Sequence, residues 1–343
     1  MTSEPRRRGL IIRDRYELGD PNRPHDPANF ESERQHLSEI TGFDIGILHF
    51  DQLYVEDRTT CHIRFLEEIA VSQAEFIFYH THLYVDQMHI NVRPEVLFAA
   101  RQISGPRLIF SFGDCAYGWQ TAYLAGYAAI GDISVSWDGQ GSRVAAMVPD
   151  RTVLDLWAPR DERYFHDLGL ERDIDVSFAG SRLYYPDRQA MLQSLTDLGI
   201  KVVTGGGDPM FRLSLRDYVD RLCRSKISLN FSLTADGNLH QFKGRVIEAI
   251  LCGALLFESE NDVTPRYLTP YRHYIPFGDA ADLAAKIRRY LGNDPARRAV
   301  AAAARAHVME NLSERVWWRR VLTELDRTWL KATKAVPQQA PSS

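Results

Sequence analysis

Short apolar runs alternate with longer amphipathic stretches along most of the chain. In the first half, four mainly apolar segments predict β-strands at residues 43–50, 75–80, 106–114 and 131–137. Between them, residues 59–73 and 93–104 repeat apolar residues at the spacing of one helix face. Strands that are apolar on both faces and separated by helices are typical of a parallel sheet covered by helices.

A second series of the same kind follows residue 173. Its predicted strands lie at 174–181, 200–207, 226–233 and 254–259, and its predicted helices at 187–199, 216–225, 279–292 and 295–312. Residues 148–173, rich in proline and charge, separate the two series and indicate a crossing between domains. The two series together predict an α/β protein with two doubly wound domains that face a cleft.

Both ends of the chain differ from these series. Residues 1–38 are polar and rich in proline, arginine and aspartate, which predicts a mostly irregular leader. Residues 314–333 have the pattern of an amphipathic helix, and the tail from 334 to 343 is expected to be disordered.

The composition is that of a soluble globular protein. The chain has 343 residues, which suits two domains, and 45% of them are hydrophobic and 25% charged. The net charge of −4 argues against nucleic-acid binding. No segment approaches the roughly 18 apolar residues of a membrane span, and the N-terminus lacks the long apolar run of a signal peptide, so only peripheral membrane contact stays open.

Four cysteines are scattered along the chain: Cys61, Cys115, Cys223 and Cys252. They form no CxxC pair, so their spacing matches neither a metal site nor a disulfide framework. Reduced thiols are typical of the cytoplasm, which is therefore the expected location.

Residues 240–260, HQFKGRVIEAILCGALLFESE, carry an unusual distribution of charge. On a helix that begins at about Gly244, the apolar side chains fall on one side, while Arg245 and Glu248 fall on the other. A helix N-terminus already favours an anion, so Lys243 and Arg245 are unfavourable there unless a phosphate binds. One interpretation is a nucleotide site, with Glu248 near the ribose hydroxyls. The other is a solvated helix start with an Arg245–Glu248 pair.

An ordered set of short motifs continues from this helix start. After Lys243 come "EA", "CG", an apolar strand, an acidic loop and the pattern F-x-D-x-x-x-L-A-x-K-I. This set resembles the donor domain of GT-B glycosyltransferases, most closely the spore-maturation (CgeB-like) group, which is related to the large retaining family that includes glycogen and sucrose synthases. Residues 174–195 similarly resemble the first strand, loop and helix of that domain. The resemblance is strong over about 174–320 and architectural over 40–150.

The resemblance implies a fold and a domain plan. The fold is GT-B, with two Rossmann-like domains facing a central cleft and a C-terminal helix that crosses back to the first domain. The implied parts are an N-terminal acceptor domain (39–155), a nucleotide-sugar donor domain (156–315) and a crossing helix (316–333). In this plan Trp317, Trp318 and Trp329 are buried anchors, whereas the alternative is a membrane-surface helix.

The resemblance also implies donor contacts. Glu248 would hold the ribose, Lys243 and Arg245 would lie near the diphosphate, and Arg188 is a further cation at the start of the next helix. The full set of implied donor-binding residues is Gly180, Ser181, Arg188, Asn238, Lys243, Arg245 and Glu248.

Position 240 departs from the family pattern. The large retaining family usually carries another glutamate eight positions before the "EA" glutamate, facing the donor sugar, and here that position is His240. His240 is therefore either a candidate catalytic group that contacts the donor or a surface loop residue. The departure leaves the choice between retention and inversion of configuration open.

Polar and aromatic side chains follow the predicted strands of the first domain. They are His80, His82, Asp86, His89, Asp114, Tyr117, Trp119 and Asp138. Aromatic rings beside carboxylates suit sugar faces and hydroxyls, although each residue can equally serve the structure. An inverting enzyme needs a general base, for which Asp114 or His82 is the candidate. No third ligand lies near the His-x-His pair, so no metal is expected.

These observations predict a metal-independent glycosyltransferase without a cofactor. It would move a hexose-type sugar from a UDP- or GDP-type donor to an acceptor hydroxyl of a glycan, protein or small metabolite, with retention favoured. The alternatives are a nucleotide-sugar epimerase or hydrolase on the same fold, or a non-catalytic nucleotide-sugar-binding protein.

Overall fold

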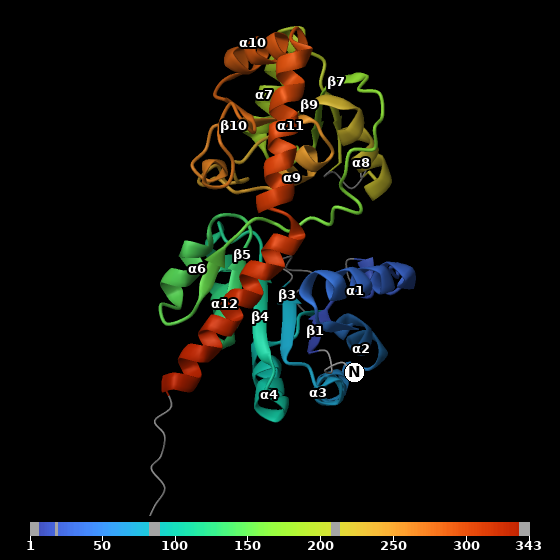
Figure 1. The fold of residues 1–343 in the computed structure, drawn as a ribbon, viewed down its shortest axis with the longest axis vertical. Helices are drawn as coiled ribbons and strands as arrows, with labels where there is room; N and C mark the ends of the chain where they lie inside the picture. Colours follow the sequence, from blue (N-terminus) through green and yellow to red (C-terminus); the bar gives the residue numbers. More distant parts are fainter. Residues whose placement is uncertain (1–6, 18–19, 82–89, 207–212, 336–343) are drawn as a thin grey trace, which may run out of the picture. The chain divides into compact units, whose positions relative to one another are not determined.

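The chain forms two compact units in a computed structural model that describes residues 7–17, 20–81, 90–206 and 213–335, with side chains up to Thr328 (Figure 1). Unit 1 comprises Met1–Leu156 and Trp318–Ser343, and unit 2 comprises Trp157–Trp317.

Unit 1 contains a six-stranded parallel sheet. Its strands are β1 (Arg8–Ile12), β2 (Asp44–Leu48), β3 (Phe76–His80), β4 (Arg107–Phe112), β5 (Ile133–Ser136) and β6 (Val153–Asp155), in the order β2-β1-β3-β4-β5-β6. Its helices are α1 (Pro27–Thr41), α2 (Phe50–Glu56), α3 (Cys61–Ser72), α4 (Pro94–Ser104), α5 (Gly118–Ile130), α6 (Gly141–Met147) and most of α12 (Glu314–Ala335). The strands and helices predicted for this half are confirmed, with small shifts at their ends.

The prediction of an irregular leader over residues 1–38 is wrong. This segment supplies β1, which pairs with both β2 and β3, and α1, which Asp26 caps by accepting a hydrogen bond from the Ala28 amide at 2.9 Å. Leu10, Ile11 and Ile12 are buried. The four apolar or small residues 9–12 are enough for a buried parallel strand. The prediction missed this strand because arginines flank so short an apolar run on both sides.

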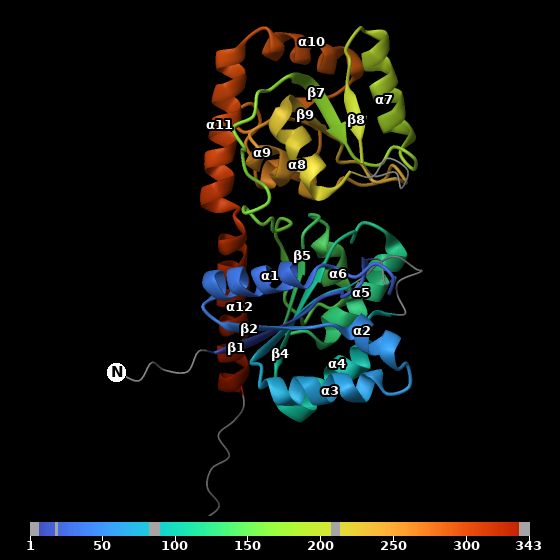
Figure 2. The ribbon, with the colours of Figure 1, turned by 90° about the vertical axis from the view of Figure 1, so that its right-hand side faces the viewer.

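The sheet of unit 1 is wound in two directions from β1. The chain runs through α1 to β2, then returns past β1 to β3 and continues to β6. Since parallel crossovers are right-handed, α1 lies on one face and α2 to α5 lie on the other (Figure 2). The face of α1 is completed by α12. Trp318 on that helix contacts Phe76 and Phe78, with ring centroids 6.4 and 4.9 Å away.

The predicted packing of α12 onto the first unit is borne out by these contacts. Trp317 and Trp318 are both buried, and Arg107 at the start of β4 donates to the Leu325 carbonyl at 3.3 Å. The side chain of Trp329 lies outside the described residues. No described helix combines the length and the apolar character needed to cross a membrane.

Unit 2 contains a five-stranded parallel sheet. Its strands are β7 (Ile174–Ala179), β8 (Val203–Gly205), β9 (Ser225–Asn230), β10 (Leu255–Ser259) and β11 (Ile275–Phe277), in the order β11-β10-β9-β7-β8. Its helices are α7 (Pro186–Asp197), α8 (Leu215–Arg224), α9 (Gly244–Leu251), α10 (Ala280–Leu291) and α11 (Asp294–Asn311). The predicted second series is confirmed, so each unit is doubly wound.

Successive side chains of the unit 2 strands face different surroundings on the two sides of the sheet. Phe178, Leu229 and Phe257 belong to the apolar core together with residues of α7 and α10. Because successive residues of a strand point to opposite faces, Asn230 and Glu258 face the side of α9 instead. The carboxyl ends of β9 and β10 are therefore polar on that face.

We predict that Trp318→Ala destabilises unit 1 by about 3 kcal/mol, because it opens a large cavity against the sheet. Chemical denaturation followed by circular dichroism measures the loss. Trp119→Ala is the matched control in the same unit, since Trp119 is 49% exposed, and it should change stability by about 0.5 kcal/mol or less. Equal effects of the two substitutions would contradict the role of α12 as cover for the sheet.

Candidate functional site

The winding direction of the unit 2 sheet changes between β7 and β9. Ligands of doubly wound sheets bind at such a point, beyond the carboxyl ends of the strands. Here β7 is followed by Gly180 and Ser181, and β9 ends at Asn230. We call the residues gathered at this point the switch-point site: Gly180, Ser181, Arg188, Asn230, Lys243, Arg245 and Glu258.

Two arginines share one aromatic ring in this site. The guanidinium carbons of Arg188 and Arg245 lie 5.3 and 5.4 Å from the ring centroid of Phe178, and that of Arg188 also lies 3.7 Å from the ring of Tyr185. Burial, followed by the nearby charge of Arg245, lowers the pKa of Arg188 to about 10. The site thus concentrates positive charge, which an anion would relieve.

Gly180 makes room for one of these arginines. A Cβ atom at this position would lie 2.5 Å from Nη2 of Arg245, so no larger residue fits without moving the guanidinium. Next to it, Ser181 Oγ and Arg188 Nε are buried and have no hydrogen-bond partner among the described residues. Unsatisfied buried polar atoms are rare, and these two border the positively charged site.

The first residues of α9 bring the remaining predicted cation into the site. Lys243 is the N-cap residue of α9 with extended backbone, and its ammonium group donates to Gln241 Oε1. Arg245 Nη1 donates to Asn230 Oδ1 at 3.0 Å. The predicted grouping of Lys243 and Arg245 at a helix start is therefore present in the fold.

Glu248 contacts other residues than the arginine pair. Its carboxylate accepts hydrogen bonds from Arg160 Nε and from the Tyr218 hydroxyl, each at 2.5 Å. Burial, reinforced by the Glu248 charge, raises the pKa of Tyr218 far above its usual range, so the phenol stays a neutral donor. The Arg160 guanidinium also covers Gly244, where a Cβ atom would collide with it. The alternative Arg245–Glu248 pair is not formed.

His240 and Asn238 both lie in the loop between β9 and α9, but their surroundings differ. Asn238 is exposed in a turn, and its amide N–H donates to Asp236 Oδ1 at 3.3 Å. Nδ1 of His240 lies 2.8 Å from Ser232 Oγ. His240 and Arg188 both line a cavity of about 350 Å³, so this cavity adjoins the switch-point site. The loop therefore brings His240, and not Asn238, to the cavity.

The candidates of unit 1 follow its strands as expected, but they differ in their surroundings. Asp114 comes after β4 with φ of 54°, a left-handed conformation that few residues other than glycine adopt. Asp138 is buried and accepts from Ser136 Oγ at 2.7 Å, which is a structural role. His82 lies outside the described residues, together with the other loop candidates Asp86 and His89.

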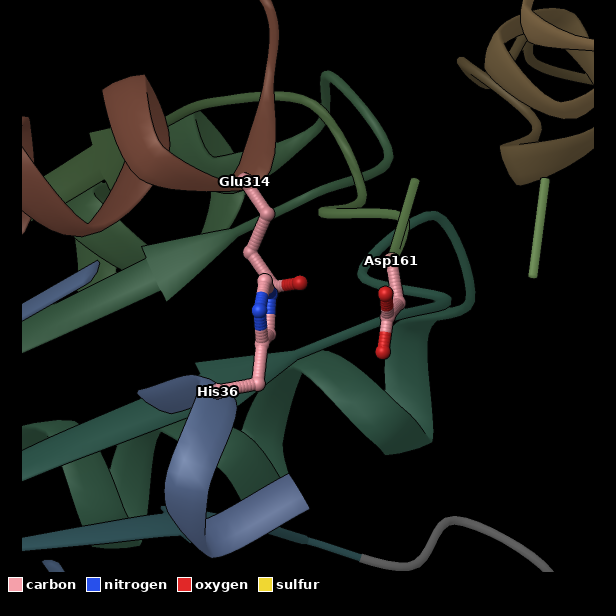
Figure 3. A group of neighbouring side chains, drawn as sticks. All are labelled: His36, Asp161 and Glu314. Carbon is pink, nitrogen blue, oxygen red and sulfur yellow. The ribbon is translucent and has the colours of Figure 1, made fainter. Parts of the chain in front are cut away.

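Three residues able to ligate a metal are drawn in Figure 3: Asp161 and Glu314 of unit 2 with His36 of α1. Asp161 has a partner within unit 2, since Arg163 Nη2 donates to it at 2.5 Å. Because the group combines residues of both units, it supports no metal site here. Metal independence stays a prediction.

Residues 182–323 match a family model described as glycosyl transferase-like. The chain carries a glycosyl transferase-like domain. Five of the predicted donor-binding residues lie within the matched segment: Arg188, Asn238, Lys243, Arg245 and Glu248. A comparison with curated protein sequences gives no match.

Solved structures resemble the chain over almost its whole length. Sucrose-phosphate synthase from Thermosynechococcus elongatus superposes with a TM-score of 0.61 at 11% identity, covering 96% of this chain and 100% of that one. HepE from Anabaena, solved in complex with UDP and glucose, gives 0.57 at 10%, covering 96% and 100%. A glycosyltransferase from Rickettsia africae gives 0.61 at 11%, covering 94% and 99%. Identities this low show the fold, which is GT-B.

The comparisons confirm the resemblance to GT-B glycosyltransferases on which the sequence prediction rested. The narrower grouping with CgeB-like proteins stays a prediction, as do the roles of individual residues in the glycosyl transferase-like domain.

Sequence reasoning missed four residues around the site. Asn230 and Glu258 had a detectable signal, because each is a polar residue at the carboxyl end of an otherwise apolar strand at the switch point. Arg160 and Tyr218 had none. They lie 88 and 30 residues from Glu248 in the sequence, and only the tertiary fold brings them to its carboxylate.

We predict that Glu248→Ala lowers the free energy of unfolding by about 2 kcal/mol, because Arg160 and Tyr218 lose a charged acceptor in a largely buried place. Arg160→Ala should have a similar effect. In a double-mutant cycle, the double variant should lose about 1 kcal/mol less stability than the sum of the two single variants. Glu171→Ala, which removes an exposed carboxylate of the same unit, should cost about 0.5 kcal/mol or less. Strict additivity would disprove the coupling.

Proposed function

We propose that this protein transfers a hexose-type sugar from a nucleotide diphosphate sugar to an acceptor hydroxyl. The observation that carries the proposal is the arginine pair. Arg188 and Arg245 lie over one ring at the switch point, and neither forms an ion pair with a carboxylate among the described residues. A diphosphate supplies the missing negative charge, and a guanidinium can grip it with two parallel hydrogen bonds.

Several features support this assignment of the donor. The glycosyl transferase-like domain spans the cation-bearing helices, and the N-terminus of α9 adds the partial positive charge of its backbone. Ser181 Oγ offers a further buried hydroxyl without a partner. HepE, one of the structural neighbours, was solved with UDP and glucose, so we propose a UDP-type donor before a GDP-type one.

Glu248 is proposed to bind the ribose. A carboxylate offers about four acceptor positions, and the bonds from Arg160 and Tyr218 use two of them. The remaining positions suit the two hydroxyls of a ribose. In this proposal the two protein donors orient Glu248 before the nucleotide arrives.

Catalysis in this proposal consists mainly of stabilising the leaving group. As the glycosidic bond breaks, negative charge grows on the diphosphate, and fixed guanidinium groups stabilise that charge without a metal. His240, held at Nδ1 by Ser232, is proposed to contact the transferred sugar from the cavity it shares with Arg188. Retention of configuration is proposed from the family resemblance, and Asp114 and His82 are the proposed general bases if the enzyme inverts.

The acceptor is proposed to bind unit 1 and to be a glycan, a protein or a small metabolite. Cys61, Cys115, Cys223 and Cys252 are all unpaired, which supports the proposed cytoplasmic location.

We predict that UDP raises the melting temperature of the protein and that Arg245→Ala and Arg188→Ala each weaken UDP binding at least about tenfold, since each removes charge-assisted hydrogen bonds to phosphate. Differential scanning fluorimetry over UDP, GDP, dTDP and CDP, followed by calorimetric titration, measures the effect. Arg289→Ala is the matched control, because Arg289 is an exposed arginine on α10. Absence of a shift with every nucleotide would refute the donor site.

A second measurement separates an enzyme from a binding protein. Release of UDP from UDP-sugars, slow in water and faster with an acceptor, is expected of a glycosyltransferase. Tight UDP binding without any release, tested over a panel of sugars and acceptors, would instead indicate a non-catalytic nucleotide-sugar-binding protein.

A further inference from the structure

A fully buried carboxyl group lies beneath the arginine pair. Glu258 on β10 is 0% exposed. Its Oε2 accepts a hydrogen bond from Asn230 Nδ2 at 2.7 Å, and its Oε1 lies 3.3 Å from Asn261 Nδ2. A charged residue in the interior requires partners, and both of these hydrogen-bond partners of Glu258 are neutral amides. Its surroundings therefore determine whether it carries a charge.

Asn230 connects this carboxyl group with Arg245. Glu258 and Asn230 are register partners in the β9–β10 pair, so their side chains point to the same face. The Asn230 amide donates to Glu258 through Nδ2 and accepts from Arg245 Nη1 through Oδ1. A flipped amide would turn two N–H donors toward the guanidinium, so both contacts fix its orientation. The result is a chain of hydrogen bonds from Glu258 to Arg245.

Protonation of Glu258 changes the charge of the switch-point site. Burial raises the pKa of Glu258 to about 8, although the Asn230 bond and the charges of Arg245, Lys243 and Arg188 act in the opposite direction. Near neutral pH the carboxyl group is therefore mostly protonated, and the cations above it have no buried counter-charge. Once ionised, Glu258 supplies that counter-charge and competes with a phosphate for the same cations.

We propose that Glu258 is a positioning residue of the diphosphate site, which holds Arg245 through Asn230 and binds a proton when the diphosphate binds. This inference rests on the proposed function. Since a bound diphosphate disfavours a second negative charge nearby, its binding takes up a proton and weakens as the pH rises.

Other titratable groups surround Glu258. Arg188 faces it from α7, Lys243 and Arg245 face it from the start of α9, and Tyr274 precedes β11. The pKa of Arg188 is about 10 and that of Tyr274 about 12. Glu260 lies two residues further along the chain and is exposed. Glu258 is thus the buried carboxyl group beside these cations whose charge can change in this pH range.

The test is calorimetric titration of the full chain with UDP from about pH 7 to about pH 9, a range in which the terminal phosphate of UDP is already ionised. For the wild type, the Kd should rise up to about tenfold across this range, because one linked proton changes the Kd about tenfold per pH unit and is taken up mainly above pH 8. Repeating the titration in two buffers of different ionisation enthalpy should show proton uptake. Glu258→Gln keeps a polar amide in place but cannot ionise, so its Kd should be nearly independent of pH.

Glu260→Gln is the control, since it removes an exposed carboxylate two residues further along the chain and should keep the pH dependence of UDP binding seen in the wild type. Equal pH dependence in the wild type and Glu258→Gln overturns the inference while leaving the donor site intact. If the Glu258→Gln protein does not fold, proton uptake by the wild type decides alone, and binding without uptake near pH 8 overturns the inference. No UDP binding at any pH refutes the proposed function itself.

Discussion

The repulsion between two guanidinium groups on one phenylalanine ring is the constraint around which unit 2 is organised. Such a pair is unfavourable unless aromatic faces, backbone carbonyls and an anion compensate it. Phe178 supplies the shared ring, and Gly180 leaves the space that Arg245 needs. Arg188 is held by the carbonyl of Ser181. These groups lie at the point between β7 and β9 where the winding direction of the sheet changes, beyond the carboxyl ends of both strands. The fold thus places positive charge beyond the carboxyl ends of the strands, where ligands of doubly wound sheets bind.

Much of this arrangement was predictable because its determinants are local in sequence. Parallel strands buried on both faces are continuous apolar runs, and charged residues mark helix starts, so most elements and the grouping of Lys243 and Arg245 followed from the sequence. Arg188 was added by the resemblance to GT-B glycosyltransferases. The prediction missed several elements, among them α1, α5, β6, β11 and β1, whose short apolar run lies among arginines. The partners of Glu248 could not be predicted, because a sequence pattern does not tell which distant residue fills the space beside a carboxylate.

His240 illustrates a different limit. The family pattern showed that a glutamate is replaced, but not what the replacement does. In the structure Nδ1 of His240 meets Ser232 Oγ, which in turn lies 3.0 Å from Ser259 Oγ. This chain ties the loop after β9 to the end of β10, so the imidazole is oriented by the sheet rather than by the loop alone. A histidine, unlike a glutamate, carries no negative charge and forms no ion pair with the adjoining arginines. Their positive charge therefore stays available for the ligand.

The same reasoning connects Glu258 with catalysis. A diphosphate leaving group carries more negative charge in the transition state than in the bound donor. A negative charge on Glu258 therefore destabilises the transition state more than the ground state. A protonated Glu258 therefore favours bond breaking as well as binding, whereas an ionised one would assist release of the product. Burial of a carboxyl group at this position, where an apolar residue would keep the site permanently cationic, makes the strength of the anion site depend on a single proton.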